Sequence, residues 1–101
     1  MKPEKEKEAH ALGVRMFKTD EWLKNALTGA NEALKSGGKE GLILVVRELS
    51  RDDHFSVNWL PLIKRASGGK DADTRAYLYH VWQGFADAYM DTYFAEPAET
   101  L

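Results

Sequence analysis

Hydrophobic positions recur at helical spacing near the start of the chain. Between residues 20 and 35 the apolar side chains fall within about 140° of a helical wheel. Thr19 or Asp20 is placed to cap the start of this segment, and Gly37 follows its end. The pattern predicts an amphipathic helix that buries one face.

A second and longer pattern occupies the C-terminal part of the chain. From Asp71 or Asp73 to about Ala95, apolar and aromatic positions cover about 180° of a helical wheel, and Pro97 follows. This arc is wider than the roughly 100° that contact with one core requires. The pattern predicts a long aromatic helix, residues 73–95. Either it is packed on several sides inside the monomer, or part of its face is left for another chain.

The segment between these patterns fits two structures. Residues 42–46 form a contiguous apolar run that suits a buried strand as well as a buried helix, and residues 55–59 alternate between apolar and polar side chains. We prefer a helix over residues 39–50, followed by one that begins at a Ser56 or Asn58 cap, because residues 47–49 extend the run without alternation. The alternative is a hairpin over residues 42–60, covered by a layer of helices.

Glycine pairs and charge mark the organisation of the chain. Gly37-Gly38 and Gly68-Gly69 are the clearest helix ends, and neither pair has the spacing of a phosphate-binding loop. Residues 1–9 form a leader of mixed charge that either frays or extends a helix through residues 11–17. We expect one domain over residues 1–101, an all-α bundle of four or five helices. The alternative is an α+β domain with the hairpin at residues 42–60.

Composition removes several classes of function. The 101-residue chain has no cysteine, which excludes disulfide frameworks, thiolate zinc sites and cysteine nucleophiles. Its 14 Lys and Arg residues nearly balance 16 Asp and Glu residues, so the surface as a whole does not attract nucleic acid. No apolar run reaches the roughly 20 residues of a membrane span. The charged N-terminal segment lacks the apolar core of a secretory signal, so we expect a cytoplasmic protein that does not contact membranes.

Charge and aromatic residues are distributed unevenly. Residues 76–101 contain no Lys or Arg, but they hold four acidic and seven aromatic residues. Such a segment is not expected to face phosphates. One flank of its aromatic arc carries residue types that are enriched at protein interfaces. These residues form the predicted partner-binding set: Tyr79, Trp82, Met90 and Tyr93.

Clusters of His and Asp do not form a recognisable catalytic or metal site. His80 and Asp91 share a helix face with Asp87, but the two lie about 16 Å apart along the axis, which is too far for one ion. We therefore expect this face to be solvated. The Asp-Asp-His segment at residues 52–54 is typical of a turn, and His54 has no visible partner or pocket for acid–base chemistry. We expect no catalytic residue, no metal and no cofactor.

A basic cluster supports a competing function. Residues 64–75 hold four basic side chains, and two short helices across a tight turn within residues 39–67 would permit a helix-turn-helix. Acidic residues in the same region dilute this cluster, so a solvated helix end is preferred. In the nucleic-acid alternative the contacting residues are Asn58, Lys64, Arg65 and Lys70.

The sequence therefore favours an interaction protein over an enzyme. We expect a small non-enzymatic accessory or regulatory protein that binds another protein, itself as a homodimer, or both. The aromatic face of the C-terminal helix carries this hypothesis. A helix-turn-helix DNA-binding regulator that uses residues 39–67 is the alternative.

Overall fold

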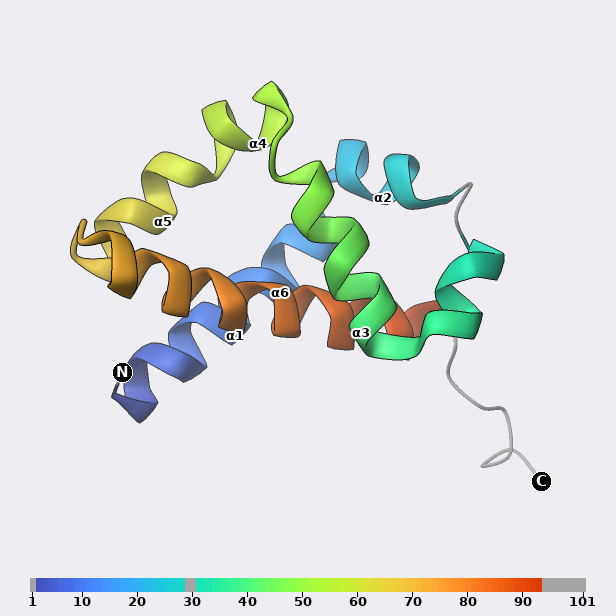
Figure 1. Cartoon of the computed structure of the whole chain (residues 1–101), viewed down its shortest axis with the longest axis horizontal. Helices are drawn as coiled ribbons and strands as arrows, with labels where there is room; N and C mark the ends of the chain where they lie inside the picture. The colour runs from blue at the N-terminus through green and yellow to red at the C-terminus, as the bar shows by residue number, and fades with distance from the viewer. Residues whose placement is uncertain (1, 29–30, 94–101) are drawn as a thin grey trace.

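Helices account for almost all of the chain that the structure describes. The computed structural model describes residues 2–28 and 31–93, and no strand forms within these ranges. The helices, shown in Figure 1, are α1 (Pro3–Thr19), α2 (Glu21–Thr28), α3 (Asn31–Leu49), α4 (Asp53–Asn58), α5 (Leu60–Ser67) and α6 (Asp71–Tyr93). The all-α prediction is confirmed, with six helices in the described ranges instead of four or five. The alternative hairpin over residues 42–60 is wrong.

The junction between α1 and α2 follows from a single capping residue. Pro3 opens α1, where its missing N–H and fixed φ suit the first turn of a helix. Asp20 ends α1, and its carboxylate accepts a hydrogen bond from the Leu23 backbone N–H at 3.1 Å. This bond caps α2, as the sequence predicted for residue 20.

The helix predicted over residues 20–35 is two helices in the structure. It ends at Thr28, and α3 begins at Asn31; residues 29–30 lie outside the described part of the chain. Helical spacing of apolar residues did not reveal this division, because the apolar positions of residues 22–34 keep one helical period in the sequence. Gly38 has a φ of 62° and bends α3 where the sequence predicted a helix end.

The second half of the 39–67 segment is helical but begins earlier than predicted. Asp52 caps α4 by accepting a hydrogen bond from the His54 backbone N–H at 2.9 Å, so neither Ser56 nor Asn58 is the cap. Trp59 separates α4 from α5, and Pro61 lies in the first turn of α5. Gly68 ends α5 in the left-handed conformation, with a φ of 91°.

The core is built around α6, which runs along the long axis of the molecule and packs closely against α1 (Figure 1). The helices α3 and α5 also contact α6. Four large side chains of α6 are fully buried: Tyr77, Val81, Phe85 and Tyr89. Most of the wide aromatic arc is therefore core, which leaves only its margins for another chain. No helix of the described ranges is long and apolar enough to cross a membrane.

Candidate functional site

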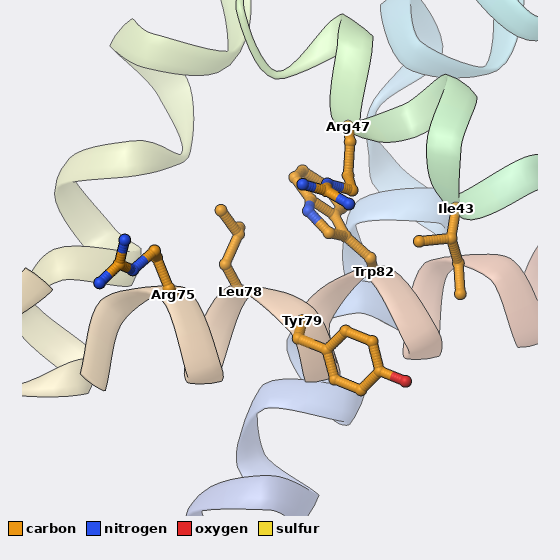
Figure 2. A pocket seen from close by; sticks show the side chains of 6 residues that line it. All are labelled: Ile43, Arg47, Arg75, Leu78, Tyr79 and Trp82. Carbon is orange, nitrogen blue, oxygen red and sulfur yellow. The ribbon is translucent and has the colours of Figure 1, made fainter. Parts of the chain in front are cut away.

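A hollow lies between α3 and α6, on the side of α6 that faces away from α1. Its walls come from side chains at helical spacing on both elements, with a volume of about 270 Å³. Figure 2 shows the lining residues: Ile43 and Arg47 on α3, and Arg75, Leu78, Tyr79 and Trp82 on α6. The hollow exists because positions three and four apart on each helix present their side chains to the same space.

A rigid aromatic ring forms the floor of this hollow. Trp82 is only 3% exposed, and its ring packs against Phe55 of α4 with the ring centroids 5.2 Å apart. Phe55 is itself 1% exposed, so the indole is held from behind by the core. A bound group would therefore meet a surface whose conformation is already fixed, which lowers the entropy cost of binding.

An adjoining hollow extends the first one along the C-terminal half of α3. It shares Arg47, Leu78 and Trp82 with the first hollow and adds the side chains of Leu44, Glu48 and Arg51, among others. We call the two hollows together the α3–α6 groove. Apolar side chains are exposed at its rim, since Leu44 is 60% and Tyr79 is 52% exposed. Large exposed apolar residues beside a hollow are typical of a contact surface.

The groove is positively charged although the whole chain has a net charge of −2. Arg47 and Arg75 form no ion pair with any described residue. Glu48 is the acidic residue of the lining, and its carboxylate lies 3.7 Å from the Arg51 guanidinium. This pair is highly exposed and weak. Two guanidinium groups are therefore available beside an apolar floor.

The predicted partner-binding residues divide between two places. Tyr79 and Trp82 meet in the α3–α6 groove, where Trp82 forms the floor and is only 3% exposed. Tyr93 is 49% exposed, but it lies about 16 Å from Trp82 along the axis of α6, where its ring contacts Phe17 of α1. Met90 is partly buried against the core. Residues from the same side of the helical wheel therefore lie on two separate surfaces of the protein.

Arg47 and Arg75 were not among the predicted site residues. They are 28 positions apart in the sequence, and only the crossing of α3 over α6 brings them to one hollow. The one local signal is that Arg47 follows Ile43 by four positions, so that an arginine stands on the same helix face as part of the apolar run.

A second cluster lies at the junction of α2, α4 and α5. The carboxylate of Asp20, which is buried, accepts hydrogen bonds from Nε1 of Trp59 and from Nε2 of His54, the latter at 2.8 Å. The ring of Trp22 stacks on His54 with the centroids 4.5 Å apart. A shallow hollow of about 340 Å³ lies beside these residues. His54 therefore has both the partner and the pocket that the sequence did not reveal.

This cluster holds helices together, and we call the hydrogen-bonded set of Asp20, His54 and Trp59 the Asp20 clamp. Burial alone would raise the pKa of Asp20, but the hydrogen bonds from Trp59, His54 and the Leu23 N–H outweigh it and hold that pKa below its ordinary value. The other ring nitrogen of His54 faces the Asn58 amide at 3.4 Å and not a hydroxyl nucleophile. The geometry ties α2 to α4 and α5 through one carboxylate.

The polar face of α6 is also more organised than predicted. The Asp87 carboxylate accepts a hydrogen bond from Nε2 of His10 in α1 at 2.8 Å. It also forms an ion pair with Nζ of Lys39 in α3 at 2.6 Å. Burial opposes the charged form of Asp87, yet the bonds from Lys39 and His10 lower its pKa. The expectation of a fully solvated face is wrong for Asp87, whereas Asp91 is exposed as predicted. Nowhere in the described ranges do three His, Asp or Glu residues come together as metal ligands.

The residues of the nucleic-acid alternative do not form one surface element. Lys64 and Arg65 are exposed in the last turn of α5, and Lys70 is exposed before α6. The amide of Asn58 donates a hydrogen bond to the His54 carbonyl at 2.8 Å within α4. Of these four residues, only Lys64 and Arg65 lie together on one helix turn, whereas the Asn58 amide is hydrogen-bonded to the backbone of its own helix.

Comparison with protein-family models, with curated proteins and with solved structures gives no match. The function proposed below rests on the geometry and chemistry of the α3–α6 groove.

Proposed function

We propose that this chain is a small, non-enzymatic regulatory protein that binds a protein partner through the α3–α6 groove, with the cytoplasm as its place of action. The observation that carries the proposal is the groove itself. Exposed Tyr79 and Leu44 surround a fixed Trp82 floor, and Arg47 and Arg75 stand beside it without an ion pair to any residue of the described ranges. Trp, Tyr and Arg are the residue types that contribute most to binding free energy at protein interfaces.

The charge of the groove favours a different protein over a second copy of the same surface. In a symmetric dimer that placed two grooves face to face, the arginines of one would oppose those of the other. Self-association therefore belongs to the other margin of α6, where Tyr93 is half exposed beside Phe17. We propose that the groove binds the partner and that a homodimer, if it forms, uses the Tyr93 end.

Capture of partners from the native host with paired variants tests this proposal. Leu44→Ser with Tyr79→Ser removes the exposed apolar rim but leaves the core intact, because both side chains are mostly exposed. The matched control is Val57→Ser, which changes an apolar side chain that is 73% exposed on α4. A specific partner should be lost with the rim variant and retained with the control. Equal capture by both variants would refute the groove as the binding surface.

Light scattering tests the homodimer separately. A mass near twice the 11.4 kDa of the chain that falls on Tyr93→Ser would support the Tyr93 end as a dimer contact. A dimer that is lost on Leu44→Ser with Tyr79→Ser, but not on Tyr93→Ser, would place the contact at the groove and contradict the assignment above.

DNA binding is the second candidate, favoured by one observation. Lys64 and Arg65 are exposed on adjacent positions of α5, which follows α4 across a short break at Trp59. A gel-shift assay with random duplex at low salt examines it. DNA binding requires a complex that weakens with salt and on Lys64→Glu or Arg65→Glu. A complex unaffected by these substitutions, or none at all, would remove this candidate.

A further inference from the structure

We infer that the α3–α6 groove takes a short acidic segment of the partner protein, with one bulky apolar side chain seated on Trp82 and carboxylates paired with Arg47 and Arg75. This inference rests on the proposed function and names the chemistry of the partner. Three properties of the groove carry it: its size, its floor and the arrangement of its charges.

The size of the hollow suits one anchoring side chain. The first hollow has a volume of about 270 Å³, which holds one large side chain, and the adjoining hollow of about 330 Å³ extends the groove along α3. From Arg75 to Trp82 the lining spans seven positions of α6, or about 10 Å along the helix axis. A peptide segment of about two helical turns covers this length, and one large side chain fills the depth.

The floor requires an apolar group at the centre of that segment. Leu78 and Trp82 line the hollow from α6, and Ile43 closes it from α3 (Figure 2). The Trp82 ring packs against Phe55 and is 3% exposed, so it offers a large aromatic surface whose position is set by the core. A leucine, phenylalanine or tryptophan of the partner would bury its apolar surface on this floor.

The charges require carboxylates on both sides of that apolar group. Figure 2 shows Arg75 and Arg47 on opposite sides of Leu78, one from each wall. A guanidinium binds a carboxylate through two parallel N–H donors, so each arginine can select an Asp or Glu of the partner. The acidic residue in the lining, Glu48, faces Arg51 and lies outside the first hollow.

The same features disfavour a nucleic acid in this place. A duplex needs a row of cations at the spacing of its phosphates, whereas here Leu78 and Trp82 separate the two arginines. The exposed side chains of Leu44 and Tyr79 at the rim would place apolar surface against the charged sugar–phosphate backbone of the duplex. An acidic peptide with an apolar centre satisfies both the cations and the carbon surface.

A binding assay with synthetic peptides tests the inference. The probe is a fluorescein-labelled peptide of about 12 residues, three helical turns, built from Glu and Leu around one central Phe. Two control peptides carry Gln in place of every Glu, or Ala in place of the Phe. The purified full chain should bind the probe, and each control peptide should bind at least about tenfold more weakly. Raising the salt from about 0.05 M to about 0.3 M should weaken binding of the probe.

Charge reversal locates the binding site. Arg47→Glu and Arg75→Glu should each weaken probe binding by about tenfold or more, and Arg47→Gln by less. The matched control is Lys64→Glu, which reverses an exposed charge on α5 and should leave binding unchanged. Circular dichroism and the urea midpoint check that each variant is folded, as expected for exposed arginines.

Each contrary outcome overturns the inference. The inference fails if the probe does not bind at millimolar concentration, if the Gln peptide binds as well as the probe, or if the arginine reversals have no effect. It fails also if random duplex displaces the probe more effectively than unlabelled peptide does. If a host partner is lost with Leu44→Ser and Tyr79→Ser while both arginine reversals retain it, the proposed function stands and only the acidic chemistry is refuted.

Discussion

Gly84 of α6 lies directly against the backbone of His10 in α1. A Cβ atom at Gly84 would stand 2.0 Å from the His10 carbonyl oxygen, and one at Gly13 would stand 1.9 Å from the Val81 carbonyl oxygen. Each of these helices thus places a glycine against the backbone of the other. This close approach explains how α1 and α6 pack over most of their length and why α6 can lie at the centre of the fold.

Alanine at either glycine should therefore destabilise the protein strongly. Gly84→Ala and Gly13→Ala force the two backbones apart, with an expected loss of more than about 3 kcal/mol in the free energy of unfolding, because the clash is with backbone and not with a flexible side chain. Gly41→Ala is the matched control, since no atom lies within 4 Å of its Cβ position. It should be neutral or stabilise by up to about 1 kcal/mol. Urea unfolding measures all three, and equal effects would contradict the close contact.

The hydrogen bond from Trp59 to Asp20 should contribute measurably to stability. Trp59→Phe keeps most of the ring but removes the N–H, which leaves the buried carboxylate with one donor fewer. We expect a loss of about 1–3 kcal/mol in the free energy of unfolding. Asp53→Asn, an exposed acidic residue in the first turn of α4, serves as the control and should change stability by less than about 1 kcal/mol. Similar losses in the two variants would show that the Asp20 clamp is unimportant.

Stability should fall at acidic pH, in part because of Asp20. Its pKa is lower in the folded chain than the ordinary value of 3.8, since hydrogen bonds from Trp59 and His54 outweigh the effect of burial. The charged carboxylate therefore stabilises the fold above pH 3.8, and this contribution is lost as the pH falls through the folded-state pKa. Asp20→Asn should be less stable at neutral pH and should show a flatter decline on acidification. Parallel curves of urea midpoint against pH would contradict this.

Alkaline pH should destabilise the fold through Tyr77. Burial, together with the hydrogen bond that its hydroxyl donates to Glu8, raises the pKa of Tyr77 to about 12. The folded state thus favours the neutral phenol, so that stability is intact below the ordinary pKa of 10 and declines as the pH rises towards 12. In a titration of tyrosinate absorbance, Tyr77→Phe should remove the component that ionises last. If that component remains, the assignment to Tyr77 is wrong.

The fold was predictable where one helix face meets one core. The apolar spacing before Gly37 and the aromatic arc of α6 both predicted helices, and Asp20, one of the two predicted caps, caps α2. The division of the predicted 20–35 helix into α2 and α3 was missed because the apolar residues of that segment keep helical spacing in the sequence. The 42–46 run was ambiguous in sequence because five contiguous apolar residues show no alternation that separates a strand from a helix. The structure buries Leu42 and Val46 and leaves Leu44 60% exposed.

The candidate site was predictable only in part, because it depends on contacts between distant segments. Tyr79 and Trp82 were chosen from residue type and wheel position, but the wheel does not say that Phe55 covers the Trp82 ring from behind. Nor does it show that the crossing of α3 over α6 brings Arg47 and Arg75 to one hollow, or that Asp20 joins His54 and Trp59. Such pairings follow from the crossing of helices, which no local pattern encodes.

Backbone amide chemical shifts, mapped during titration with the acidic probe peptide, would locate the peptide on the surface of the protein. We expect the perturbed amides to cluster in two segments that line the α3–α6 groove: residues 43–51, which cover the end of α3 and the turn after it, and residues 75–82 of α6. Perturbations that cluster instead at residues 58–70, or at the Tyr93 end of α6, would contradict the assignment of the groove as the binding surface. So would a titration that leaves the spectrum unchanged.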